Sequence, residues 1–116
     1  MTDARSRVTT HVLDAVSGRP AAGVAVALEH KAGEAGWQPV TTGVTDDDGR
    51  IADFGPVDLE PGTYRVSFAT GEHFARTGQP SFYPEVVISF SLTDPDAHYH
   101  VPLLLSPFAF STYRGS

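Results

Sequence analysis

Hydrophobic and polar residues alternate along several short segments of the chain with a period of two residues. Val24, Val26 and Leu28 are separated by alanines, and a similar alternation recurs in residues 64–69 and 86–91. This period is typical of β-strands with one face buried and the other exposed. We therefore predict strands at residues 7–14, 23–30, 37–45, 62–70, 85–91, 98–105 and 109–114, and the pattern allows a further short strand near residues 51–54.

Glycine, proline and aspartate separate these segments, as expected where a chain reverses direction. Only residues 71–77, followed by Gly78 and Pro80, could form a helix, because apolar residues elsewhere never keep the helical period of about 3.6 residues. Short strands separated by turns favour an all-β fold, a two-sheet antiparallel sandwich with one short helix. A length of 116 residues fits one domain that spans residues 1–116.

The charge balance of the chain narrows the range of partners. It has 8 lysine and arginine residues, 14 aspartate and glutamate residues and a formal net charge of −6. No extended basic surface is available for a phosphate backbone, so nucleic acid is not an expected partner. The lack of cysteine excludes disulfides, thiolate metal ligands and a thiol nucleophile. No apolar run is long enough for a membrane-spanning helix or a signal peptide, so we expect no membrane partner and a cytoplasmic location.

The predicted strand 98–105 carries two histidines on one face. One side presents His98, His100, Pro102 and Leu104, and the other side presents the bulkier apolar set Tyr99, Val101, Leu103 and Leu105. We expect the apolar set to enter the sandwich core, so that the histidines face outward. A face that mixes leucine and proline with histidine favours association, so we expect a second copy of the chain to cover it.

Two histidines and one arginine are candidates for chemistry. A histidine titrates near neutral pH and can move protons, so His11 and His100 could activate water. A single histidine is more often structural, and each of these two could merely form a hydrogen bond at a strand edge. Arg50 follows the turn 46–49, which could direct its planar guanidinium toward a ligand or leave it solvated.

The remaining histidines raise one further alternative. His98 and His100 have a spacing that zinc sites also use, and His11 could supply a third ligand. We regard this metal site as the less favoured interpretation. His30 and His73 have no evident converging partner in the sequence, so we expect both to be solvated.

Four motifs together point to a known family. They are THVLD at residues 10–14, DGR at 48–50, HYHVPLLLSP at 98–107 and YRGS at 113–116. With these motifs the chain resembles the transthyretin-like 5-hydroxyisourate hydrolases, enzymes of urate breakdown. The resemblance implies a transthyretin-like (prealbumin-like) sandwich, a homotetramer built as a dimer of dimers, and catalysis without metal or cofactor. It implies catalytic roles for His11, Arg50, His100 and Ser116, substrate binding by His11, Arg50 and Tyr113, and no part for His98.

The implied reaction is hydrolysis of 5-hydroxyisourate to 2-oxo-4-hydroxy-4-carboxy-5-ureidoimidazoline, by attack of water on a cyclic amide. Which of His11 and His100 acts as the base stays open. One alternative is a non-enzymatic carrier of small ligands like transthyretin, which the polar candidate residues oppose. Another alternative is a structural prealbumin-like module, because such modules have turns similar to those predicted for this chain. The chain has no asparagine for the isopeptide crosslink that adhesin modules of this kind often carry.

Overall fold

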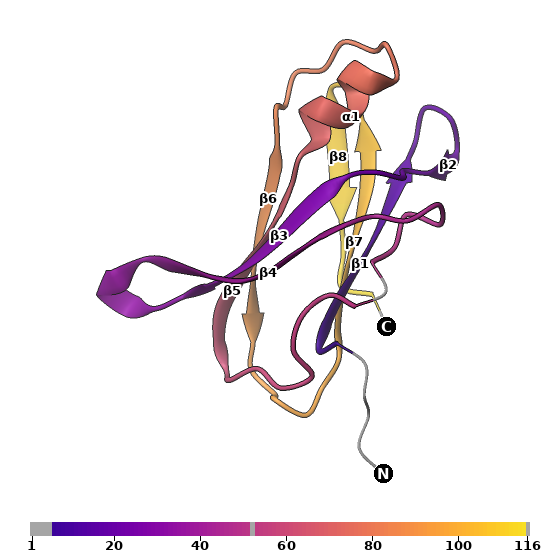
Figure 1. Cartoon of the computed structure of the whole chain (residues 1–116). Helices are drawn as coiled ribbons and strands as arrows, with labels where there is room; N and C mark the ends of the chain where they lie inside the picture. The colour runs from indigo at the N-terminus through magenta and orange to yellow at the C-terminus, as the bar shows by residue number, and fades with distance from the viewer. Residues whose placement is uncertain (1–5, 52, 116) are drawn as a thin grey trace.

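A computed structural model of the chain describes residues 6–51 and 53–115, which form two layers of β-strands and a short helix (Figure 1). The strands are β1 (Val8–Asp14), β2 (Arg19–Pro20), β3 (Ala25–Lys31), β4 (Trp37–Val44), β5 (Gly62–Phe68), β6 (Val86–Leu92), β7 (Tyr99–Ser106) and β8 (Ala109–Thr112). A 3₁₀ helix (Gly33–Ala35) lies between β3 and β4, and helix α1 (Thr70–Arg76) follows β5. The predicted all-β two-sheet sandwich with a short helix is confirmed.

The alternating pattern located the long strands to within two residues at each end, and the helix predicted at residues 71–77 is α1, displaced by one residue. The further strand allowed near residues 51–54 is not formed, because Ile51, Asp53 and Phe54 lie in loop conformations and Ala52 is outside the described residues. Strand β2 was not predicted, since two residues are too few to show a period. Neither helix in the described segments has the length and apolar character needed to cross a membrane.

The strand order is β2-β1-β7-β8 in one sheet and β4-β3-β5-β6 in the other. The described strands pair in antiparallel fashion except for β1 and β7, which run parallel. In that pair Thr9 lies opposite His100, and His11 lies opposite Pro102. This parallel pairing departs from the antiparallel arrangement expected for the sandwich. It also brings the two candidate catalytic histidines onto neighbouring strands.

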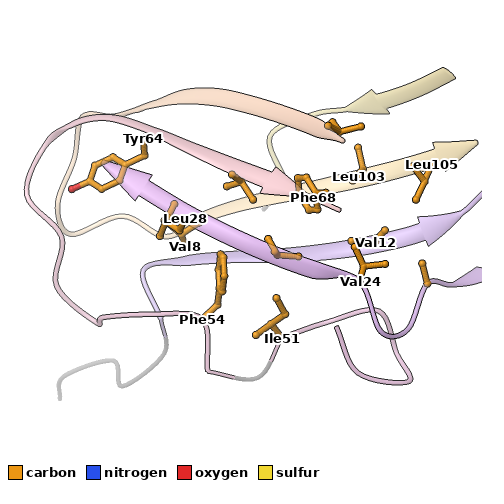
Figure 2. Close-up of a cluster of buried hydrophobic side chains, with 14 of the residues drawn as sticks. Val8, Val12, Val24, Leu28, Ile51, Phe54, Tyr64, Phe68, Leu103 and Leu105 are labelled. Atoms are coloured by element: carbon orange, nitrogen blue, oxygen red, sulfur yellow. The ribbon is translucent and has the colours of Figure 1, made fainter. Parts of the chain in front are cut away.

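The inward faces of both sheets form the core (Figure 2). The largest fully buried side chains are Tyr64, Phe54, Phe68, Phe74, Leu28, Leu92, Leu103 and Leu105. Figure 2 shows Ile51 and Phe54 extending from the loop after β4 toward the strands, where they belong to the same buried cluster. The apolar residues of β7 that were predicted to face inward are all buried, so the predicted orientation of its two faces is confirmed. On its other face His100 and Leu104 are half-buried, whereas Pro102 is already buried within one copy of the chain.

A buried pair of polar side chains connects helix α1 with strand β1. His73 Nε2 lies 2.9 Å from Asp14 Oδ2, and the two side chains are 7% and 5% exposed. Burial alone would raise the pKa of Asp14. The carboxylate, however, accepts hydrogen bonds from His73 and from the backbone amides of Val16 and Ser17, and His73 also attracts it electrostatically. Together these interactions lower the pKa below its ordinary value of 3.8. The expectation that His73 is solvated is therefore wrong.

His30 is not a freely solvated residue either. Its ring stacks on Tyr64 with 4.5 Å between the ring centroids, and it is half-buried. Tyr64 is 1% exposed and its hydroxyl donates to the Glu60 carbonyl at 2.6 Å. Both His30 and Tyr64 come from paired positions of β3 and β5, where facing side chains are close enough to interact.

Candidate active site

The outer face of the β2-β1-β7-β8 sheet carries the two candidate histidines. Residues on this face of β1 alternate with the buried residues Val8, Thr10 and Val12, which leaves Thr9 and His11 on the side away from the core. His100 lies beside Thr9 on the neighbouring strand, and both histidines are half-buried. A half-buried imidazole is accessible to a small molecule, and the neighbouring residues of the sheet restrict its orientation. The outward orientation predicted for His100 is thus confirmed.

The turn before Arg50 places that residue against β1. Asp46 Oδ1 accepts the backbone N–H of Arg50 at 3.0 Å, and the Asp46 N–H donates to the Arg50 carbonyl at 2.7 Å. Gly49 has a φ of 73°, and a Cβ at this position would overlap the carbonyl oxygen of Val12. The Gly49 carbonyl in turn accepts the N–H of Val12 at 2.8 Å. Only glycine satisfies both this conformation and this close approach, and the docking creates a β-bridge between His11 and Arg50.

The last described residues fold back onto β7. Gly115 forms a β-bridge with His100, and its N–H donates to the His100 carbonyl at 2.9 Å. The Arg114 guanidinium lies 4.7 Å from the centroid of the Tyr99 ring, a cation–π contact that anchors this segment. Tyr113 is 61% exposed beside it. Ser116, the remaining candidate, lies outside the described residues.

The surroundings of His100 favour its neutral form. Burial makes the largest contribution to lowering its pKa below the ordinary value of 6.5, and the charges of His98, His11 and Arg50 lower the pKa further. A hydrogen bond with the backbone of Thr9 acts in the opposite direction. His11 forms a β-bridge with Arg50 and lies opposite Pro102, two residues from His100 on the same face, so the structure brings these three predicted residues together. A neutral imidazole at neutral pH can accept a proton from water.

Thr9 is a residue of this site that sequence reasoning missed. Its Oγ1 lies 2.8 Å from His98 Nε2 and 2.9 Å from His100 Nδ1. The available signal was the spacing of Thr9 and His11, which puts them on one face of a strand. The other half of the contact depends on the pairing of β1 with β7, which the pattern of residues does not show. Among residues 6–51 and 53–115, no group of three or more His, Cys, Asp or Glu side chains is arranged to hold a metal ion.

A cavity of about 350 Å³ opens next to the site, between β6 and the segment 112–114. His100, Tyr113 and Arg114 are among its lining residues, and most of the wall is apolar, including Phe90 and Val101. His11 and Arg50 do not contribute to it. The polar chemistry is therefore concentrated on the outer sheet face and not inside this cavity.

The strand topology places the chain in the class of transthyretin-like β-sandwich proteins. The sequence model of the HIUase/Transthyretin family matches residues 8–115, and the chain belongs to this family. A relative from Caulobacter vibrioides, named 5-hydroxyisourate hydrolase, is 47% identical over 115 residues, covering 96% of this chain and 99% of the relative. The predicted resemblance is confirmed.

Two solved structures are similar over nearly the whole chain. The 5-hydroxyisourate hydrolase of Klebsiella pneumoniae superimposes with a TM-score of 0.82 at 38% identity, covering 94% of this chain and 98% of the other. Transthyretin from Sparus aurata superimposes with a TM-score of 0.90 at 34% identity, covering 96% and 97%. The backbone alone thus does not separate hydrolase from transthyretin, and the side chains of the site must do so.

Proposed function

We propose that this protein hydrolyses 5-hydroxyisourate to 2-oxo-4-hydroxy-4-carboxy-5-ureidoimidazoline in urate breakdown. The observation that carries the proposal is the convergence of His11, Arg50 and His100 on one outer sheet face. The relative from Caulobacter vibrioides, 47% identical, bears the name of this activity. A pair of proton-transfer groups next to a fixed cation can catalyse hydrolysis of a cyclic amide.

In the proposed reaction His100 is the general base. Its lowered pKa keeps the ring neutral, so it can take a proton from water as the water oxygen bonds to the ring carbonyl carbon. Arg50 stabilises the negative charge that develops on the carbonyl oxygen. As the carbon–nitrogen bond breaks, His11 in its protonated form donates a proton to the departing ring nitrogen. His100 then releases to solvent the proton that it took from water, and His11 regains one, so both residues return to their initial states. Water is consumed, no covalent intermediate forms on the protein, and Tyr113 and Ser116 serve in substrate binding and in supporting the histidine pair.

The carrier alternative has one point in its favour, the high structural similarity to transthyretin from Sparus aurata. Shared backbone shape is expected within one family and does not determine function. The outer face here bears imidazoles and a guanidinium, which suit proton transfer and charge stabilisation better than the binding of an apolar ligand. The carrier and the structural module are therefore not favoured.

The direct test is optical. Freshly generated 5-hydroxyisourate, made from urate with urate oxidase, should decay faster with the chelator-treated protein than spontaneously. Replacing His11 or His100 with alanine, or Arg50 with glutamine, should each lower kcat/KM by roughly a hundredfold or more.

Two matched substitutions serve as controls for these variants. Arg19→Gln removes an exposed arginine from β2, and His30→Gln removes a histidine from the other sheet. Both should retain the wild-type rate. Decay at the spontaneous rate with folded wild-type protein would contradict the proposal and favour the carrier.

We also propose a homotetramer, a dimer of dimers, in the cytoplasm. The outer face of β7 carries half-buried Leu104 next to the candidate histidines, which supports coverage by another copy. Light scattering at assay concentration should give the mass of four chains, and a monomer would contradict this assembly. Cell fractionation tests the location, and recovery outside the cytoplasm would contradict it.

A further inference from the structure

The hydroxyl of Thr9 lies between two imidazole rings. It approaches His98 Nε2 at 2.8 Å and His100 Nδ1 at 2.9 Å, both within the range of good hydrogen bonds. Thr9 comes from β1, whereas His98 and His100 belong to the segment that leads into and forms β7. All three residues are half-buried, so these bonds are partly shielded from water.

A hydroxyl has a single proton, and this fact links the two rings. Thr9 can donate to one imidazole nitrogen while it accepts an N–H from the other ring. If Thr9 accepts from His100 Nδ1–H, its own proton is directed to a bare Nε2 on His98. If the bonds run the other way, His100 Nδ1 is bare and its proton lies on Nε2. The hydroxyl therefore couples the proton on His100 Nδ1 to the proton on His98 Nε2, so that the direction of the two bonds sets the tautomer of His100.

We propose that Thr9 is a positioning residue that holds His100 as its Nδ1–H tautomer, with His98 as the final acceptor of the chain His100 Nδ1–H to Thr9 Oγ1–H to His98 Nε2. This tautomer leaves His100 Nε2, on the opposite side of the ring from Thr9, without a proton and able to act as the base. The catalytic part of this inference rests on the proposed function. It also gives His98 a role that the family resemblance did not imply.

The direction of the chain follows from what happens when the base works. On accepting a proton at Nε2, His100 becomes an imidazolium that carries an N–H on both nitrogens. In the proposed direction Thr9 already accepts from Nδ1–H and need not turn, whereas in the opposite direction its hydroxyl would have to rotate during the reaction. A site that needs no such reorganisation stabilises the charged state better.

The other groups that act on His100 are consistent with this arrangement. His98, His11 and Arg50 all disfavour its charged form, while a hydrogen bond with the backbone of Thr9 favours it. The backbone of Thr9 thus supports the imidazolium when it forms, in addition to the contact made by the hydroxyl. The burial of the ring and the positive charge of Arg50 keep His100 neutral before the reaction.

Nitrogen NMR of the substrate-free protein tests the tautomer independently of activity. In ¹⁵N-labelled wild type, the His100 signals should show a protonated Nδ1 and a bare Nε2 at a pH where the ring is neutral. Thr9→Val, which keeps the shape but removes the hydroxyl, should shift His100 toward the other tautomer.

Thr10→Val is the matched control for this experiment. It lies one residue along the same strand, and its hydroxyl donates to the Val101 carbonyl at 2.7 Å on the opposite face. The His100 signals should be unchanged in this variant. A bare Nδ1 in wild type, or identical His100 signals in wild type and Thr9→Val, would overturn the proposal, even if the protein did not hydrolyse 5-hydroxyisourate.

Kinetics provide the second measurement. Thr9→Val should lower kcat by about tenfold to a hundredfold with KM nearly unchanged, the scale seen when the hydrogen-bond partner of a functional histidine is removed. Thr9→Ser, which restores the hydroxyl, should recover most of the rate. If Thr9→Val folds and keeps the wild-type kcat, or if Thr9→Ser is as impaired as Thr9→Val, the positioning role is refuted.

Discussion

Replacing Gly115 with alanine should separate activity from stability. The backbone of Gly115 is not in the left-handed region, so alanine is allowed there, and the hydrogen bond from its N–H to the His100 carbonyl can remain. The added Cβ would overlap His100 Cδ2, and it would lie 3.1 Å from Cγ and 3.2 Å from Cβ of the same side chain. The imidazole ring or the segment bearing Gly115 must therefore move.

The size of the effect follows from these distances. Ordinary van der Waals contact begins at 3.4 Å, so relief of the overlap requires a displacement on the order of 1 Å. A misplacement of about 1 Å at a catalytic group can lower the rate by roughly a hundredfold. The free energy of unfolding should change by less than about 1 kcal/mol, because the substitution meets no unfavourable φ.

The assay compares Gly115→Ala with wild type in 5-hydroxyisourate decay and in urea denaturation. Ser111→Ala, on exposed β8, is a control in the same terminal region and should match wild type in both. A Gly115→Ala protein with wild-type stability and a rate within about threefold of wild type would refute the inference that His100 must occupy this position.

Three further predictions follow from the structure. Replacing Asp14 with alanine leaves His73 without its buried partner and should lower the free energy of unfolding by about 3 kcal/mol at pH 7. Because the pKa of Asp14 is lowered, this stabilisation is present above pH 3.8 and is lost as the pH falls through the folded-state pKa, so pH-independent urea curves would contradict it. Arg50→Gln removes a positive neighbour and should raise the pKa of His100 in an NMR titration, whereas an unchanged or lower value would contradict their proximity. Gly49→Ala should lower the thermal stability and should lower kcat/KM at least about tenfold, because a Cβ at this position overlaps β1. Wild-type values of both quantities would show that the turn does not position Arg50.

The local features of this fold could be predicted from the sequence. Alternation with a period of two located the long strands, and it assigned the two faces of β7 because each face is a property of consecutive residues. The candidate residues His11, Arg50 and His100 were likewise identified within short motifs. Their convergence could be inferred only from the family resemblance, since the sequence pattern does not reveal that β1 pairs with β7.

Contacts between distant residues were the part that could not be predicted. His73 was expected to be solvated because its partner Asp14 is 59 residues away in the chain. Thr9 is separated from His98 and His100 by 89 and 91 residues, so its bonds to them depend on the register of a parallel strand pair. A polar residue in a strand gives no local sign of which side chain it will meet across the sheet.

The most direct test of the central claim is the decay of freshly generated 5-hydroxyisourate with chelator-treated wild type and with a folded His11→Ala, His100→Ala double variant. We predict strong acceleration by wild type and a rate near the spontaneous one for the double variant. No acceleration by folded wild type would contradict the proposed function. Equal acceleration by both proteins would contradict the histidine mechanism.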